Sequence, residues 1–233
     1  HRLLSNGNHN TISGGVGNRV QSNTIQSTIS GGQYNSVEGI GCVISGGISN
    51  TASGRGHVIG GGQYNQVSST VSSGIFAGST NSIFTDFSFI GGGNNNIINY
   101  GNNTSVIAGG ASNVITGTAI RSSIVGGINN LINDPIGYGF IGAGFSNSIG
   151  IGRVSTIVGG SQNSIDSSGG GESRFAFIGG GNLNTITGDS QFGAIVGGYR
   201  NIMSGGGYNF IGAGLQNSIP GSFSFIGGGQ YNR

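Results

Sequence analysis

The sequence is built on one short pattern that returns fourteen times. Each copy has an Ile, a Gly three residues later and an Asn three residues after that Gly, and an apolar residue follows two positions beyond the Asn wherever the chain extends that far. Successive copies are 15 to 17 residues apart, with a single interval of 21. A fixed period this short is typical of repeat architectures, in which each unit buries its apolar side chains against its neighbours. We therefore expect a single continuous repeat domain over residues 1–233, with a longer loop at 166–176.

Two ladders follow from this pattern. The repeated Ile is at Ile12, Ile29, Ile44, Ile59, Ile75, Ile90, Ile107, Ile124, Ile141, Ile157, Ile178, Ile195, Ile211 and Ile226. The repeated Asn is at Asn18, Asn35, Asn50, Asn65, Asn81, Asn96, Asn113, Asn130, Asn147, Asn163, Asn184, Asn201, Asn217 and Asn232. We expect the Ile side chains to stack inside the core and the Asn side chains to form a hydrogen-bonded ladder at a turn. Asn at a turn also tolerates left-handed backbone and can hydrogen-bond neighbouring backbone groups.

Each repeat divides again into two halves of 7 to 9 residues, as the spacing of Asn201, Asn209 and Asn217 shows. Each half has only four or five residues of strand character between Gly, Ser and Asn, and the chain contains 53 Gly, which disfavours helix interiors. Short strands closed by turns fit this composition. The sequence therefore predicts an all-β, parallel β-solenoid or β-roll of about 14 coils, with two short strands per coil of 15–17 residues. At a strand spacing of roughly 4.8 Å, the coils would extend over about 65 Å. The glycines three and four residues before the Asn would thin the coil or supply turn dihedrals.

A second apolar face lies beside the repeated Ile. Residues seven and five positions before each Asn point away from the core, because side chains alternate along a strand. From residue 43 onward, nearly every repeat places one bulky apolar side chain at one of these positions and a smaller residue at the other. We call these bulky residues the apolar stripe: Val43, Val58, Phe76, Phe89, Val106, Val125, Phe140, Val158, Phe177, Val196, Phe210 and Phe225.

A stripe of this length exceeds the apolar surface that a soluble monomer usually exposes. We expect it to be a self-association face, buried against other copies of the chain, most simply around a three-fold axis. One alternative is that the second half of each repeat folds over the stripe within one chain. Another is that the stripe lies inside a sheath.

The segments SFIGGG (88–93), SVIAGG (105–110), SSIVGG (122–127), STIVGG (155–160) and SFIGGG (224–229) resemble the repeats of trimeric autotransporter adhesin heads. The resemblance covers nearly the whole chain, and similar Gly-Gly-x-x-Asn arrays look like parts of bacterial surface proteins and of viral or phage fibres. It implies a left-handed parallel β-roll that trimerises along its apolar strand. The chain departs from that family in its doubled Gly and regular Asn.

Few residues suggest chemistry. Asp166, Glu172 and Asp189 lie in or near the long loop, and converging carboxylates would be needed for glycoside hydrolysis. We expect His57 to lie on the surface and the single Cys42 to be buried packing. Turn residues that could contact a sugar are Gln33, Tyr34, Gln63, Tyr64, Tyr199, Gln230 and Tyr231. We expect no catalysis and no cofactor. We also expect no metal, because calcium-binding β-rolls carry Asp at their turns, whereas the turn residue here is Asn or Ser.

The formal net charge is only +2 and the charged residues are scattered along the chain, so no nucleic-acid partner is expected. The sequence contains no run of 18 or more apolar residues, so no membrane insertion is expected. The leading expectation is a non-catalytic structural and adhesive repeat protein forming a rigid extracellular rod, fibre or filament. It would lie outside the cell or on a cell or virion surface. Its partner would be itself, as a homotrimer or head-to-tail filament, and possibly a host surface or glycan. The alternatives are a polysaccharide-binding or -degrading β-helix like that of a viral or phage tailspike, and an ice-binding solenoid. The latter needs a regular Thr array, whereas Thr11, Thr28, Thr51, Thr156 and Thr185 are irregularly placed.

Overall fold

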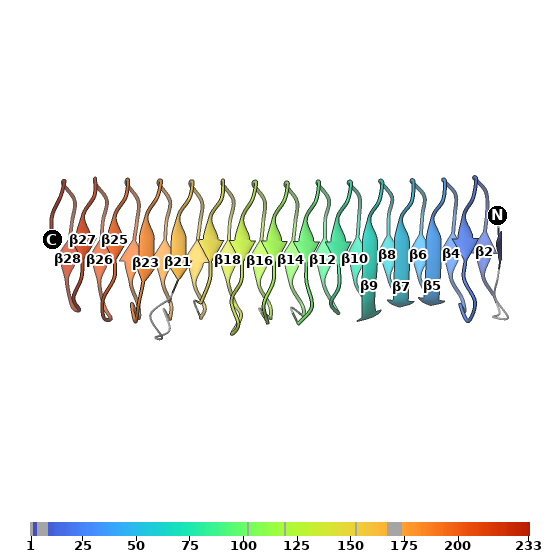
Figure 1. Cartoon of the computed structure of the whole chain (residues 1–233), viewed down its shortest axis with the longest axis horizontal. Helices are drawn as coiled ribbons and strands as arrows, with labels where there is room; N and C mark the ends of the chain where they lie inside the picture. The colour runs from blue at the N-terminus through green and yellow to red at the C-terminus, as the bar shows by residue number, and fades with distance from the viewer. Residues whose placement is uncertain (1, 4–8, 102, 119, 152, 167–173) are drawn as a thin grey trace. The chain divides into compact units, whose positions relative to one another are not determined.

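The computed structural model describes residues 2–3, 9–101, 103–118, 120–151, 153–166 and 174–233. Residues 1–112 and residues 113–233 form two compact units, and each is a parallel β-solenoid (Figure 1). A turn of about 16 residues carries two short strands, and the described residues contain no helix. The predicted fold class is confirmed, with about 13 turns in the chain. That residues 1–233 make one domain stays a prediction.

Residues 1–112 contain two parallel sheets, each with its strands in chain order. The odd sheet comprises β1 (Arg2–Leu3), β3 (Arg19–Val20), β5 (Ser36–Ile40), β7 (Thr51–Arg55), β9 (Gln66–Val71), β11 (Ser82–Ile83) and β13 (Ile97–Ile98). The even sheet comprises β2 (Thr11–Ile12), β4 (Thr28–Ile29), β6 (Val43–Ile44), β8 (Val58–Ile59), β10 (Gly74–Ile75), β12 (Phe89–Ile90) and β14 (Val106–Ile107).

Residues 113–233 repeat this arrangement. Their odd sheet comprises β15 (Val114–Ile115), β17 (Leu131–Ile132), β19 (Ser148–Ile149), β21 (Ser164–Asp166), β23 (Thr185–Thr187), β25 (Ile202–Met203) and β27 (Ser218–Ile219). Their even sheet comprises β16 (Ser123–Ile124), β18 (Phe140–Ile141), β20 (Thr156–Ile157), β22 (Phe177–Ile178), β24 (Ala194–Ile195), β26 (Phe210–Ile211) and β28 (Phe225–Ile226).

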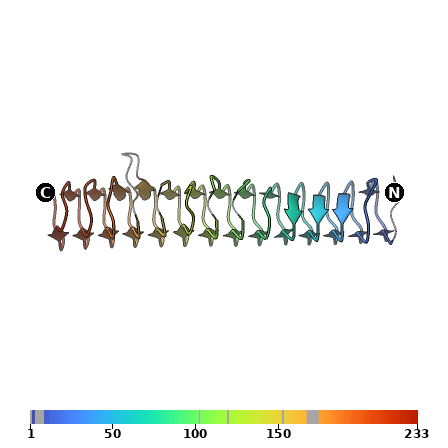
Figure 2. The same ribbon diagram turned by 90° about the horizontal axis from the view of Figure 1, so that it is seen from below.

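The core of each unit lies between its two sheets, which form separate layers in Figure 2. Equivalent residues pair from coil to coil, so that Ile75 lies between Ile59 and Ile90. Twelve of the fourteen repeated Ile side chains are buried, whereas Ile12 and Ile226 are partly exposed. The odd sheets supply the facing ladder, with buried residues Val20, Val37, Ala52, Val67, Ile83, Ile98, Ile115, Ile132, Ile149, Ile165, Ile186, Met203 and Ile219.

The repeated Asn occupies one corner of each coil and points inward. Thirteen of the fourteen are buried and Asn232 is exposed. Asn50 shows the common pattern: its Nδ2 donates to Asn35 Oδ1 (3.1 Å), Gly46 O (3.0 Å) and Gly62 O (3.0 Å). Its Oδ1 accepts a hydrogen bond from Asn65 N at 3.0 Å. Each amide therefore satisfies backbone groups of its own coil and of the next, where no water reaches them.

The repeated Asn does not itself adopt the left-handed conformation. That conformation belongs to the residue before it, as in Tyr34 (φ 56°), Ser49 (φ 54°) and Tyr64 (φ 55°), and to the Gly three residues before it. The cause is stacking: the N–H of Tyr34 must point along the stack to Val16 O, at 2.9 Å. The turn therefore lies at the preceding residue, which leaves the Asn side chain free to enter the core.

The two consecutive glycines of the repeat differ. Gly62 has a φ of +87°, and a Cβ there would lie 2.0 Å from Gly78 O in the next coil. Gly61 has no atom within 4 Å of such a Cβ, and Ala77 occupies the equivalent place one coil later. Only the second glycine is therefore required by turn geometry and close approach. Nothing in the structure explains the first.

We expect Gly62→Ala to lower the free energy of unfolding by about 3 kcal/mol, since it adds a backbone clash to left-handed strain. The matched variant Gly61→Ala should change it by less than about 0.5 kcal/mol. Urea denaturation followed by circular dichroism measures both. Equal effects of the two substitutions would contradict the assignment.

The opposite corner carries a second, mostly small-residue ladder two positions before the repeated Ile. Cys42 N donates to Ser27 Oγ and Ser88 N to Ser73 Oγ, at 3.0 and 3.1 Å. His57 belongs to this ladder and is fully buried, so its expected surface position is wrong. Ser73 N donates to His57 Nδ1 (3.1 Å), which makes Nε2 the protonated nitrogen that donates to Ser69 O (3.1 Å). The imidazole thus replaces a hydroxyl as a backbone acceptor.

Candidate functional site

The apolar stripe lies on the outer surface of the even sheets. In residues 1–112, the exposed fractions are 48% for Val58, 70% for Phe76 and 43% for Phe89, while Val43 and Val106 are partly exposed. The second half of each coil packs against the repeated Ile on the other side of this sheet. The alternative in which that half covers the stripe is therefore wrong.

Residues 113–233 carry the stripe on seven consecutive strands. Val125, Val158 and Val196 are each about half exposed, Phe140 and Phe177 are each 37% exposed, and Phe225 is 74% exposed. Phe210 is partly exposed and its ring stacks on that of Phe225, with centroids 5.1 Å apart. Burial of apolar surface is the main favourable term in most protein association, so this face has the composition of an interface.

The glycine that follows the repeated Ile has two neighbours. A Cβ on Gly179, directly after β22, would lie 2.4 Å from Val196 O in the next coil and 3.3 Å from the ring of Phe177. At Gly91 the corresponding distances are 2.3 Å to Ala108 O and 3.5 Å to the ring of Phe89. Each Phe ring therefore lies along its own strand over the glycine. The face is low where no ring covers the glycine, as at Gly74.

One of the low places is a defined depression. It has a volume of about 240 Å³ and lies around Gly74, with Val58, Ile75, Phe76 and Phe89 among its walls. An apolar cavity of about 150 Å³ accommodates benzene, so this depression is large enough for an aromatic ring. Its opening faces away from the core, on the same surface as the stripe.

The predicted carboxylate cluster is only partly placed. Asp166 ends β21, where it pairs with Thr187 of β23, and Asp189 follows two residues later. Glu172 lies outside the described residues. Among the residues that the structure describes, no three His, Cys, Asp or Glu side chains lie close enough together to hold a metal ion. Cys42 is fully buried, as expected, and burial raises the pKa of its thiol.

The turn residues predicted to contact a sugar are dispersed. Tyr34, Tyr64 and Tyr231 are 61%, 58% and 65% exposed, but Ser49 separates the first two along the stack. Tyr199 lies under the guanidinium group of Arg200, 5.0 Å from its ring centroid. Sugar contact stays a prediction. The threonines form no single array: Thr11, Thr28 and Thr156 belong to even sheets, whereas Thr51 and Thr185 belong to odd sheets.

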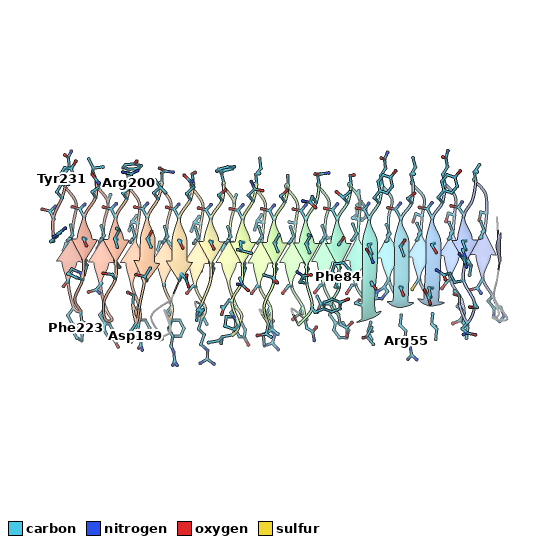
Figure 3. All side chains as sticks on the ribbon, viewed as in Figure 1. Arg55, Phe84, Asp189, Arg200, Phe223 and Tyr231 are labelled. Atoms are coloured by element: carbon cyan, nitrogen blue, oxygen red, sulfur yellow. The ribbon has the colours of Figure 1, made fainter. Side chains whose placement is uncertain are left out.

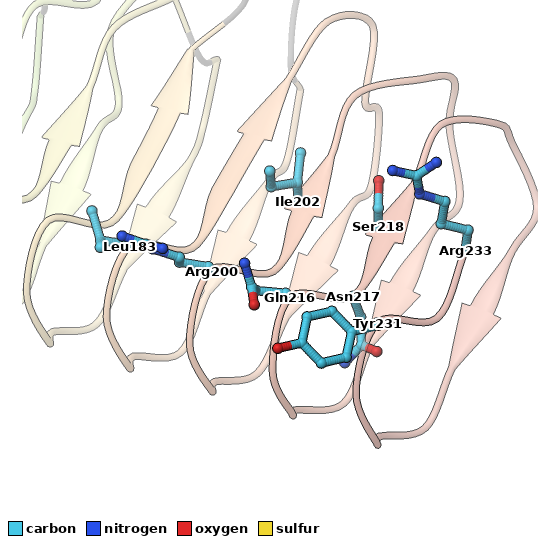
Figure 4. Close-up of a pocket in the computed structure, with 8 residues that line it drawn as sticks. All are labelled: Leu183, Arg200, Ile202, Gln216, Asn217, Ser218, Tyr231 and Arg233. Atoms are coloured by element: carbon cyan, nitrogen blue, oxygen red, sulfur yellow. The ribbon is translucent and has the colours of Figure 1, made fainter.

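A groove of about 670 Å³ lies beside Arg200 and Tyr231 (Figure 4). Leu183, Gln216 and Ile202 also line it, together with Asn217, Ser218 and Arg233. Figure 4 shows Leu183, Arg200, Gln216 and Tyr231 following one another along the corner, with Ile202 and Ser218 on the adjoining strands. None of these eight lining residues is a His, Cys, Asp or Glu.

A column of aromatic rings, which was not expected from the sequence, lies at the corner before the even strands of residues 174–233. Phe175, Phe192, Tyr208 and Phe223 stack with centroids 5.0, 5.2 and 5.3 Å apart. All four have left-handed backbone, and Phe223 lies at the edge opposite Tyr231 in Figure 3. An aromatic residue nine positions before the Asn in four consecutive repeats was the available signal. Because the rings cover one another's faces, the column stabilises adjacent coils and does not offer a flat sugar platform.

The described residues include no helix of the length and hydrophobicity that crossing a membrane requires. The described coils are those of a β-roll repeat, which is the part of the adhesin-head resemblance that the fold bears out. No protein-family model matches the sequence, and no curated protein matches it significantly.

Proposed function

We propose that this chain is a non-catalytic structural and adhesive repeat protein of an extracellular fibre, filament or adhesin head, and that it associates with copies of itself through the apolar stripe. The observation that carries the proposal is the exposure of Phe and Val side chains on consecutive strands of one sheet face. A continuous row of exposed apolar side chains lowers the solubility of a protein unless another surface covers it. The stacked ladders beneath it form a firm support, because each coil is held to the next by backbone and side-chain hydrogen bonds.

A partner with the same repeat suits this face better than an unrelated one. Stripe residues follow the coil spacing of roughly 4.8 Å, and a second copy presents the same spacing. The stripe carries no ionisable side chain, so association would rest on apolar burial and not on charge. The resemblance to adhesin heads supports the further part of the proposal, an adhesive role at a cell or virion surface.

The test is the mass of the particle in solution, measured by light scattering over a dilution series. The parent chain should form a particle of at least twice the 23.2 kDa of one chain. Replacing Val158 and Phe177 by Glu should return it to the monomer with an unchanged circular dichroism spectrum, since it places charges in a desolvated interface. The matched control replaces Ser148 and Ser164, on the outer face of the odd sheet, by Glu. This control should assemble like the parent. A monomeric parent at tens of micromolar, or a stripe variant that still assembles, would refute the proposal.

A further inference from the structure

We infer that a groove on the outer side of the odd sheet, where β9 ends, binds a neutral saccharide. The inference rests on the adhesive part of the proposed function and names a class of ligand for it. The groove lies within residues 1–112 and has a volume of about 360 Å³. This volume is within the usual range for sites that bind small molecules. The groove is separate from the apolar stripe, which lies on the even sheet.

The groove exists because the odd strands change length at this place. β9 has six residues and β11 has two, so their pairing covers only the first two residues of β9. Beyond that pairing, the carboxylate of Asp86 takes the place of a neighbouring strand. Its Oδ1 accepts hydrogen bonds from Thr70 N (2.6 Å) and Val71 N (2.8 Å). Two backbone donors thereby hold the carboxylate in a fixed position beside the groove.

Several polar atoms around the groove have no partner within the described residues. Asp86 uses Oδ1 for the two amides, and its Oδ2 accepts no hydrogen bond from them. Asn103 Oδ1 accepts from Thr85 Oγ1 at 2.7 Å, which leaves Asn103 Nδ2 as a donor. Three hydroxyl groups that also make no hydrogen bond in this part of the chain belong to Ser53, Ser68 and Thr70. The groove therefore offers a carboxylate acceptor, an amide donor and hydroxyl groups to a ligand.

An aromatic pair also lines the groove. The rings of Phe84 and Tyr100 stack with centroids 5.5 Å apart and planes 29° apart. Tyr100 is 69% exposed and Phe84 is partly exposed. Aromatic rings beside hydrogen-bonding groups suit a ligand that is apolar on one face and polar at its edge. A sugar ring has this form, since its C–H bonds gather on one face and its hydroxyl groups surround it.

The charge of the groove favours a neutral ligand. Asp86 is the one carboxylate among the residues that line it, and none of them is a Lys, Arg or His. A uronate, sulfate or phosphate group would be repelled by this carboxylate and would find no cation to pair with. Sugar hydroxyl groups can donate to Asp86 Oδ2, and hydrogen bonds to a charged acceptor are stronger than those between neutral groups.

A quaternary ammonium compound is the main competitor, because carboxylates and aromatic rings also attract cations. The two rings stack on each other, however, and do not form a cage around a central space. The hydroxyl groups of Ser53 and Ser68 would also find no hydrogen-bonding partner on methyl groups. A saccharide can use the aromatic rings and the hydroxyl groups together.

The test is isothermal titration calorimetry of the full chain at neutral pH. The probes are short neutral oligosaccharides of glucose, galactose and mannose, with choline and a galacturonate oligomer for comparison. At least one neutral saccharide should bind with a dissociation constant in about the millimolar range or below. Its addition should also shift the amide resonances of Thr70, Val71 and Asn103 in nuclear magnetic resonance spectra.

Asp86→Asn keeps an oxygen for the two backbone amides and replaces the free acceptor by a donor. It should raise the dissociation constant at least about tenfold. Asn103→Asp keeps the acceptor for Thr85 and removes the free donor, so it tests the same site if Asp86→Asn does not fold. Tyr100→Ala should raise the constant at least about threefold. Thermal melts monitored by circular dichroism identify any variant that fails to fold.

Two matched controls make the same chemical changes elsewhere. Asp189→Asn removes a carboxylate from an exposed side chain in residues 113–233. Tyr64→Ala removes a ring that is 58% exposed at the corner of the repeated Asn. Both should bind the saccharide within about twofold of the parent value, because neither residue lines the groove.

The inference is overturned if no neutral saccharide binds, if choline or galacturonate binds more tightly, or if the groove variants bind like the controls. The stripe variant, with Val158 and Phe177 replaced by Glu, should bind the saccharide like the parent, since the groove is formed within one chain. Self-association is measured by the particle mass and saccharide binding by calorimetry. Either proposal can therefore fail while the other stands.

Discussion

Replacing Ile90 by Asp is expected to lower the free energy of unfolding by about 5 kcal/mol or more and to unravel the coils on either side of it. Ile90 is fully buried and pairs with Ile75 and Ile107 in the adjacent strands. The substitution removes the apolar contacts of the Ile90 side chain in its layer of the core. It also buries a carboxylate among apolar side chains that cannot pair with it. Because a solenoid is stabilised mainly between neighbouring coils, the loss should spread locally before it spreads to the whole stack.

Urea denaturation and amide hydrogen exchange measure this effect, the latter by loss of protection in β10, β12 and β14. The control is Phe89→Asp on the same strand, since Phe89 points outward and is 43% exposed. It should weaken association of copies while leaving most of the folding stability of the chain. If the Ile90 variant melted like the parent, the inward ladder would not hold the coils together.

Replacing Asn50 by Asp is expected to cost about 4 kcal/mol at neutral pH. The variant keeps an oxygen to accept from Asn65 N, but an ionised carboxylate cannot donate to the oxygens of Asn35, Gly46 and Gly62, all about 3 Å from the present Nδ2. The folded state would favour the protonated acid, so the pKa of the introduced carboxyl would lie above its unfolded value. The stability deficit should therefore grow as pH rises from about 4 to 7, because the folded state then loses a proton that it holds more tightly.

Denaturation midpoints at several pH values measure this dependence, and the control is Asn94→Asp at the same corner. Asn94 is exposed, so a carboxylate there stays hydrated. A deficit in the Asn50 variant that does not change with pH would show that the corner amide is not needed as a donor.

The period of the sequence was sufficient to predict the class of fold, because an Ile at constant spacing leaves few ways to bury a chain so rich in glycine. The strict spacing of Asn likewise indicated a ladder. The second corner was harder to predict: Ser, Cys, His and Gly share it, and His57 enters the core only because the backbone donor of Ser73 needs an acceptor there. No local pattern in the sequence shows that need.

The positions of the residues with left-handed backbone were equally hard to predict from the sequence. Phe192 and Arg200 are poor candidates for positive φ, yet both adopt it because their N–H groups donate to carbonyl groups of the preceding coil. The constraint is between coils and not along the chain. The apolar stripe could be found from the sequence, since the alternation of bulky and small residues is written in each strand, but the Gly74 depression required the packing of β8, β10 and β12.

The coils do not vary in length at every place. From the small corner residue to the repeated Asn the count is constant, as from Ser27 to Asn35 and from Ala176 to Asn184, whereas the number of residues from the Asn to the next small corner residue varies between repeats. The differences in coil length therefore lie between each repeated Asn and the next small corner residue, and in one coil the extra residue lies within β9, where the pairing with β7 shifts register between Ser53 and Arg55. Extra residues in this segment leave the Ile and Asn ladders in register. The segment is therefore where a peptide could be inserted without altering those ladders.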